Sequence, residues 1–224
     1  MSKKVFLSPS NQYDNVYAYG NTTEGVQCGK IADACKIALE RSGVDVMLMH
    51  DESMQEKCAA SNAFDADLHV PIHTNAFNGK VMGTRMFCYS SDGKGMTACK
   101  AIYSRLAPIT PGDSENIQVN ADYYEVRVPA APSAYIECEF HDTVDGAKWI
   151  VENTVLIGET IARGICDYFG VKFVEKPKPV EPEKKDVLYR VQIGAYKIKA
   201  NAEKRQAEAK AAGFTDAFIV TVEQ

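Results

Sequence analysis

Between residues 4 and 170 the chain alternates short apolar segments with longer amphipathic ones, and this order restricts the fold more than any other feature. The apolar segments have the length and composition of β-strands: KVFL, VDVMLM, ADLHVPIH, TRMFCYS and SAYIECEF. Helix-like segments separate most of them: one ends at Gly43, another opens with Ser53 and Glu56 at capping-box spacing, and a long one covers residues 145–170. This alternation predicts an α/β fold with a mainly parallel twisted sheet and helices on both faces.

A proline-rich, charged segment, EKPKPVEPEKKD, divides the chain. Its alternating charges and single aliphatic residue, Val180, leave little apolar surface to bury, so we expect an extended linker over residues 175–186. A domain over residues 1–174 precedes it, and a small βαβ module over residues 187–224 follows it. A βαβ unit of roughly 38 residues is below the size that normally folds alone, so we expect the module to pair with the domain, a second copy or missing residues.

Charge and hydropathy argue against two classes of partner. The net charge is −5 and the tail is only slightly basic, which argues against nucleic acid. No segment approaches the roughly 18 apolar residues of a membrane span, and the start, MSKKVFLSPS, lacks the apolar run of about 7 to 15 residues that a secretory signal needs. We therefore expect a protein kept in the cytoplasm until something releases it, and its seven cysteines, which form no CxxC pair, to be mostly reduced and buried.

Polar residues at predicted strand ends are candidates for chemistry, because ligands gather at the carboxyl ends of parallel strands. The first strand runs into SPSNQ, His73 ends the strand in PIHTNA, and Glu24 stands where the first helix begins. In YIECEFHD, Glu137, Glu139 and His141 alternate with apolar residues, so we expect them on one face. Each of these also has an ordinary structural explanation. His73 can be a hydrogen-bonded histidine at a strand end, Glu24 can stabilise the helix dipole, and the strand in YIECEFHD can face solvent. If that face meets His73, they form a metal and general-base site.

These residues resemble a family, the zinc-dependent N-acetylmuramoyl-L-alanine amidases of type 3, over nearly all of residues 3–173. Glu24 matches the family's second zinc ligand, and His73 in PIHTNA matches the third, with Asn75 as the following asparagine. IECEF matches the strand that carries the catalytic base, which implies that role for Glu137. The resemblance implies hydrolysis of the amide bond between N-acetylmuramic acid and L-alanine in peptidoglycan. We assign Asn75, Glu139 and His141 to substrate contacts, with Glu139 either tuning Glu137 or lying at the rim.

The chain departs from the family at SPSNQ, where Asn11 falls in the place of the first zinc histidine. An amide oxygen is a weaker zinc donor than imidazole. We predict zinc held by Glu24, His73 and Asn11; alternatively His69, Glu139 or His141 completes the site, or the metal differs. The stretch LSPSNQ resembles a subgroup found in phage-type lysins of Gram-positive bacteria, which implies a phage or prophage endolysin. A host autolysin released by lysis and a non-catalytic peptidoglycan-binding protein derived from an amidase are the alternatives.

The C-terminal segment resembles one half of a SPOR domain, a peptidoglycan-binding module of two βαβ repeats, through VQIGAY and AAGF. The resemblance implies binding to glycan strands, which would hold the enzyme at its substrate. Because a second repeat is absent, we expect a homodimer that pairs the open strand edge.

Overall fold

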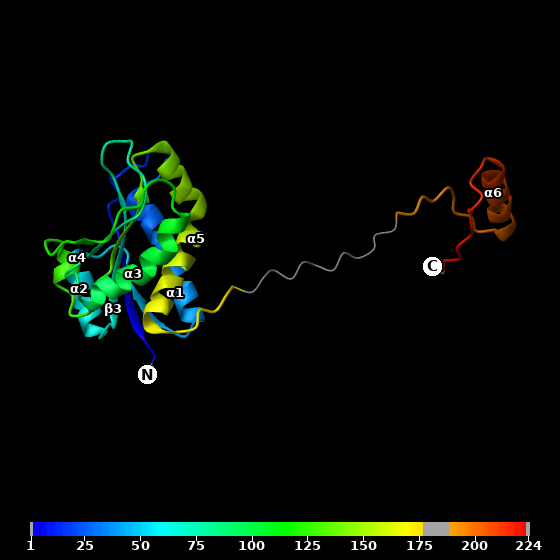
Figure 1. Ribbon diagram of the computed structural model, residues 1–224. Helices are drawn as coiled ribbons and strands as arrows, with labels where there is room; N and C mark the ends of the chain where they lie inside the picture. The colour runs from blue at the N-terminus through cyan, green and yellow to red at the C-terminus, as the bar shows by residue number, and fades with distance from the viewer. Residues whose placement is uncertain (1, 177–188, 223–224) are drawn as a thin grey trace. The chain divides into compact units, whose positions relative to one another are not determined.

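The computed structural model describes residues 2–176 and 189–222, which belong to two units, Met1–Pro177 and Lys178–Gln224 (Figure 1). The expected linker over residues 175–186 lies outside the described residues except for its first two.

The N-terminal unit is built on one six-stranded sheet with the order β2-β1-β3-β6-β4-β5. All neighbouring strands are parallel except β4, which runs antiparallel to β6. The five strands expected from the sequence are present, and the two-residue strand β5 is additional. Their bounds are Lys4–Pro9 (β1), Asp45–Leu48 (β2), Leu68–Asn75 (β3), Arg85–Cys88 (β4), Gln118–Val119 (β5) and Tyr135–Phe140 (β6).

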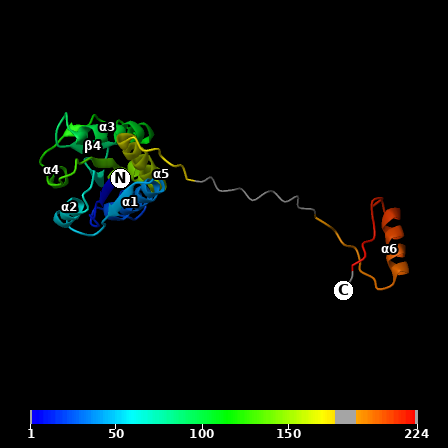
Figure 2. The same ribbon diagram turned by 90° about the horizontal axis from the view of Figure 1, so that it is seen from below.

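Helices cover both faces of this sheet, as the sequence predicts (Figures 1 and 2). One face, which we call the back, packs against α1 (Glu24–Arg41), α3 (Lys94–Leu106) and α5 (Val144–Phe169). The other, the front, carries α2 (Met54–Ala63) and the short α4 (Tyr124–Arg127). A 3-10 turn (Ala107–Ile109) follows α3. The expected capping box is formed, because the Ser53 side chain accepts from the Glu56 N–H and the Glu56 carboxylate accepts from the Ser53 N–H.

The core lies between the back of the sheet and its three helices. In β3, Leu68, Val70 and Ile72 are completely buried in this core, whereas His69 and His73 point to the front. The helix α5 packs very closely on its neighbours: a Cβ on Gly158 would lie 2.4 Å from the carbonyl oxygen of Ile31 in α1. The alternation of β3 therefore separates an apolar back from a front that carries polar side chains.

The pairing of β3 with β6 contains an irregularity that bears on the site. His73 pairs with Glu137, but Asn75 pairs with Phe140, so β6 contains one extra residue over this stretch. Such a bulge redirects the side chains that follow it. The strict alternation that we expected to carry from Glu137 through Glu139 to His141 is therefore interrupted.

The seven cysteines are all buried and free, as expected. Among the described residues, no helix is both long enough and apolar enough to cross a membrane.

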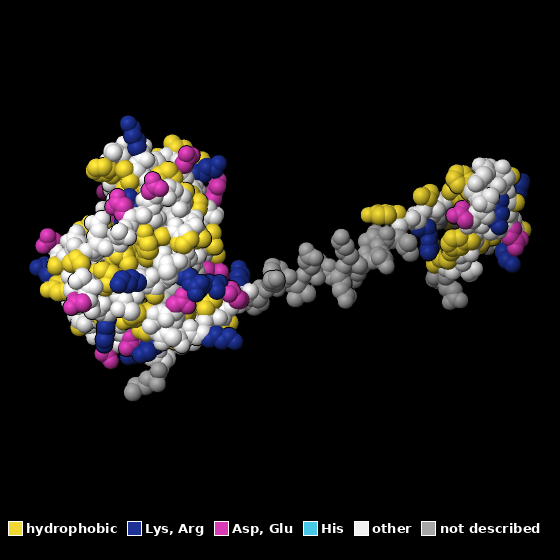
Figure 3. All heavy atoms as spheres, viewed as in Figure 1, with side chains coloured by type: hydrophobic (Ala, Val, Ile, Leu, Met, Phe, Trp, Pro, Cys, Tyr) yellow, Lys and Arg dark blue, Asp and Glu magenta, His cyan; other side chains and the backbone are white. Residues whose placement is uncertain are grey.

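The C-terminal unit contains one regular element within residues 189–222, the helix α6 (Lys199–Ala211). The strands expected in LYRVQIGAY and DAFIVTV are not formed there, and this prediction is wrong for the described residues. A strand needs a neighbour to satisfy its backbone groups, and these two segments do not pair with each other. Apolar side chains remain exposed on this unit (Figure 3), among them Tyr189, Val191, Ile193, Phe214, Phe218 and Val222.

Candidate active site

A carboxylate and an imidazole lie in contact on the front of the sheet, near the carboxyl end of β3. The loop after β1 leads to Glu24 at the start of α1, and β3 supplies His73; Glu24 Oε1 and His73 Nδ1 lie 2.9 Å apart. The second oxygen of Glu24 accepts a hydrogen bond of 2.7 Å from the Asn15 amide. Because Glu24 is only 1% exposed, this pair is held away from bulk water at the position expected for both residues.

Burial and pairing act in opposite directions on this pair. Burial by itself raises the pKa of Glu24, but the hydrogen bonds from His73 and Asn15 and the charge of His73 leave that pKa below its usual value. Burial likewise lowers the pKa of His73, while the bond to Glu24 and the charges of Glu137 and Glu24 raise it overall. Each partner of the pair therefore favours the charged form of the other.

Glu137 lies opposite His73 on β6, in register with it. It is 8% exposed, and its Oε2 atom is buried without a hydrogen-bond partner. Burial raises the pKa of Glu137 to about 8, with the charge of Glu24 adding to the effect and His73 opposing it. A carboxyl group with this pKa exchanges protons near neutral pH, which suits a general acid and base.

An aromatic wall adjoins the pair. The Tyr135 ring stacks on His73 with 4.8 Å between centroids, and Tyr123, just before α4, packs on Tyr135 at 5.0 Å. Phe87 of β4 packs against both tyrosines. The wall excludes water from one side of His73.

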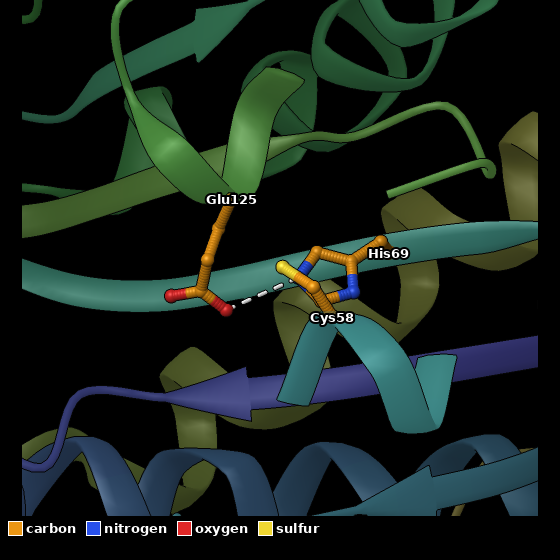
Figure 4. Close-up of side chains that lie close together, drawn as sticks. All are labelled: Cys58, His69 and Glu125. Carbon is orange, nitrogen blue, oxygen red and sulfur yellow. Dashed lines mark hydrogen bonds and ion pairs between the residues drawn. The ribbon is translucent and has the colours of Figure 1, made fainter. Parts of the chain in front are cut away.

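A second group of side chains lies deeper on the front, between α2, β3 and α4 (Figure 4). His69 Nε2 is 3.2 Å from Glu125 Oε1, which also accepts a hydrogen bond from Ser8 Oγ, and Cys58 completes a cluster of metal-type donors within 4.8 Å of one another. Because Glu125 is bonded to β1 and β3, it fixes α4, and with it Tyr123, to the sheet. The alternative that His69 completes the site at His73 is not supported, since its Nε2 is directed to Glu125.

Asn11 is not brought to the Glu24–His73 pair. Its amide nitrogen donates to the carbonyl oxygens of Asp51 and Glu52, at 3.3 and 3.1 Å, and so holds the loop before α2. The next residue, Gln12, occupies the expected place, with Nε2 3.4 Å from Glu24 Oε1 and 3.5 Å from His73 Nδ1. The prediction that Asn11 lies beside Glu24 and His73 is therefore corrected: Gln12, the next residue, lies there.

Glu139 and His141 are buried and bonded elsewhere, so the structure does not place them as substrate contacts. The Glu139 carboxylate accepts from the backbone N–H groups of Gly83 and Phe140, at 2.7 and 2.6 Å. His141 Nδ1 lies 3.0 Å from Thr74 Oγ1, and its ring stacks on Tyr17. The bulge in β6 is the physical reason, because it turns these side chains away from the face of Glu137. The like charge that helps to raise the pKa of Glu137 comes from Glu24, and not from Glu139 as one alternative supposed.

Asn75 stays half-buried at the end of β3, where its side-chain oxygen accepts from the Ala76 N–H at 2.8 Å. A substrate contact by Asn75 remains a prediction.

Sequence reasoning missed Gln12 and Glu125. For Gln12 the sequence contained a signal, which is the spacing of two residues between Ser8, Ser10 and Gln12. The side chains of Ser8 and Ser10 both form hydrogen bonds on the front, and the same alternation places Gln12, and not Asn11, on that side. For Glu125 there was none, because α4 is too short to show periodicity.

The donors fit a metal ion. A buried carboxylate and an imidazole are common zinc ligands, and the unpartnered oxygen of the buried Glu137 is a group that a nearby cation would stabilise. Next to a carboxyl that exchanges protons near neutral pH, such donors make the arrangement typical of hydrolases that activate water at a metal. The fold and site thus define an α/β domain with a centre of the metal-dependent hydrolase type.

Comparison with known proteins is more specific. The model of the N-acetylmuramoyl-L-alanine amidase family matches residues 12–167, and that of the SPOR domain matches residues 172–223. The chain belongs to the N-acetylmuramoyl-L-alanine amidase family and is an enzyme of that class.

Three relatives illustrate the match. The chain is 27% identical to the sporulation-specific N-acetylmuramoyl-L-alanine amidase of Bacillus subtilis (strain 168), over 97% of this chain and 84% of that protein. The catalytic domain of CwlV, an amidase from Bacillus (Paenibacillus) polymyxa, superimposes with a TM-score of 0.69 at 17% identity, over 77% of this chain and all of that domain. The catalytic domain of the CD27L endolysin, which targets Clostridium difficile, gives a TM-score of 0.62 at 18% identity, over 75% of this chain and 97% of that one.

Proposed function

We propose that the protein cleaves the amide bond between N-acetylmuramic acid and the L-alanine of the stem peptide, using a zinc ion held by Glu24 and His73. The observation that carries this proposal is Glu137, whose buried, unpartnered carboxyl oxygen and raised pKa stand in register with His73. A zinc ion bound here supplies the polarisation of the carbonyl and the acidity of a bound water.

The residues of the chain have distinct tasks in this reaction. Glu137 takes the proton of the attacking water and later gives it to the leaving amine of L-alanine. Glu24 and His73, whose Oε1 and Nδ1 atoms lie 2.9 Å apart, would hold the zinc ion, and the Asn15 amide fixes the Glu24 carboxylate by a hydrogen bond to its other oxygen. Tyr135 and Tyr123 keep water from the outer side of His73, so the charges in the site act at a low local dielectric constant.

The test of the reaction is a cleavage assay on purified Gram-positive cell walls. We expect release of free L-alanine amino groups without release of reducing sugar, and loss of this release when a chelator is added. Glu137→Gln abolishes turnover and keeps zinc, His73→Ala loses both, and Glu152→Gln on the exposed side of α5 serves as the matched control. If no type of cell wall releases amino groups when zinc is supplied, the proposed cleavage is refuted, and the alternative of a non-catalytic peptidoglycan-binding protein is favoured.

We further propose a phage or prophage endolysin that is made in the cytoplasm and acts on the wall after release. The resemblance of LSPSNQ to lysin sequences supports this role. A host amidase is the second candidate, and the alignment with a sporulation-specific amidase along 97% of the chain favours it. Adding purified protein to vegetative Gram-positive cells and to sporulating cultures, and measuring lysis of each, distinguishes the two candidates. Lysis of vegetative cells is expected for an endolysin.

For the C-terminal unit, we propose binding to glycan strands and pairing of two copies. The match to the SPOR model supports the first, and the exposed apolar residues on both sides of α6 support the second. Sedimentation of the full chain and of a chain ending at residue 176 tests the pairing: a dimer that becomes a monomer on truncation is expected. A monomeric full chain contradicts it.

A further inference from the structure

The loop after β1 presents two adjacent amide side chains that have different surroundings. The side-chain nitrogen of Asn11 donates to the carbonyl oxygens of Asp51 and Glu52. Gln12 is exposed, and its amide lies over the Glu24–His73 pair, with Ser10 Oγ 3.4 Å from its nitrogen. The Gln12 amide is therefore the one of the two that lies at the Glu24–His73 pair, whereas the Asn11 amide is directed to the loop before α2.

The spacing of the three groups suits a common metal ion. The Gln12 amide nitrogen is 3.4 Å from Glu24 Oε1 and 3.5 Å from His73 Nδ1. Ligand atoms at the usual zinc distances stand about 3.4 Å apart at the corners of a tetrahedron. The remaining separation, 2.9 Å between Glu24 and His73, is a direct hydrogen bond that a metal would replace. The three side chains therefore lie close enough together to hold one metal ion between them.

We infer that Gln12 is the third metal ligand, through its side-chain oxygen. Without metal, the amide turns its nitrogen toward the Glu24 carboxylate, while its oxygen accepts from Asn15 at 3.0 Å. The terminal torsion of glutamine is broad and nearly two-fold, so a half-turn brings the oxygen to the metal. That turn gives up one bond to Asn15, whose amide keeps its bond of 2.7 Å to Glu24 Oε2.

This ligand set has a chemical consequence. One imidazole, one carboxylate and one neutral amide oxygen form a harder and weaker set for zinc than two imidazoles and a carboxylate, although the formal charge is the same. The protein should therefore bind zinc less tightly than a variant with histidine at position 12. The inference rests on the proposed function only in that it takes the metal to sit at Glu24 and His73.

The test is zinc affinity of the full chain, measured by competition with a chromophoric chelator and needing no substrate. Removal of outer partners of a metal already costs about 10- to 100-fold in affinity, so Gln12→Ala should weaken zinc binding at least 10-fold. Gln12→His should tighten it and change the visible spectrum of the Co²⁺-loaded protein. Asn11→Ala, the matched control one residue away, should alter zinc affinity less than threefold.

The outcomes separate this inference from the proposed function. If Gln12→Ala and Asn11→Ala bind zinc like the unchanged protein while His73→Ala does not, Gln12 is no ligand and the metal site stands. If Asn11→Ala has the large effect and Gln12→Ala has none, the assignment is reversed. If His73→Ala also binds zinc normally, the metal does not sit at Glu24 and His73, and the proposed mechanism is refuted as well.

Discussion

Replacing Glu137 by glutamine should increase the free energy of unfolding of the metal-free enzyme, and this increase should become larger as the pH rises. Burial raises the pKa of Glu137 from 4.5 to about 8, so the folded protein holds this proton more tightly than the unfolded chain does. The stabilisation from the protonated carboxyl is fully present below pH 4.5 and is lost as the pH rises through 8. Glutamine resembles the protonated acid and does not titrate, so the variant avoids this loss.

The size of the effect follows from the two pKa values. Each pH unit between them is equivalent to about 1.4 kcal/mol, so the variant should exceed the wild type by about 3 kcal/mol at pH 7 and by about 5 kcal/mol at pH 9. Below pH 4.5 the two proteins should differ little. Bound zinc should reduce the difference, because a nearby cation favours the ionised carboxylate.

The assay is urea unfolding of chelator-treated protein at several pH values. The only tryptophan, Trp149 in α5, packs against the core, so its fluorescence reports on the N-terminal unit alone. Glu152→Gln serves as a control with an exposed carboxyl. Stability curves of wild type and Glu137→Gln that run parallel from pH 5 to pH 9 would refute the reasoning, since Glu137 would then have an ordinary pKa.

Three further predictions concern other parts of the structure. Glu125→Ala should destabilise the N-terminal unit by about 2 kcal/mol, because it removes the hydrogen-bond partner of the buried side chains of His69 and Ser8, and it should raise KM by loosening Tyr123. Urea unfolding and cleavage kinetics check both effects. Gly158→Ala should lower stability by about 2 kcal/mol or more, since its Cβ would lie 2.4 Å from a carbonyl oxygen of α1; an unchanged melting temperature contradicts this. A chain ending at residue 176 should cleave soluble muramyl peptides as well as the full chain but cut insoluble walls more slowly, whereas equal rates on walls would deny the C-terminal unit a binding role.

Much of the N-terminal unit could be predicted, because its signals are local. Strand alternation, the capping box at Ser53 and the order of strands and helices follow from residues close together in the sequence. Glu24 and His73 stand at a helix start and a strand end, and the resemblance to the amidases singled out both of them together with Glu137 of β6. Their assembly into one site is a consequence of the parallel pairing of β1, β3 and β6.

The errors arose where one residue changes the direction of a side chain. The extra residue in β6 turns Glu139 and His141 from the expected face, and nothing in YIECEFHD announces a bulge. Asn11 and Gln12 were confused because matching a family motif fixes a position only to within a residue in a loop. The C-terminal strands that residues 189–222 do not form have another cause, since a strand needs a neighbouring strand to satisfy its backbone groups.

The burial of all seven thiols makes their chemical reactivity a measure of opening motions. Cys58 is a buried residue of α2 itself, whereas Cys35, Cys138 and Cys166 belong to the core behind the sheet. A thiol reagent can reach each of them only when the surrounding structure opens, so labelling rates resolved by cysteine would rank the local opening free energies. Faster modification of Cys58 than of the core cysteines would show that the front layer, which contributes Tyr123 to the wall beside His73, separates from the sheet before the molecule unfolds as a whole.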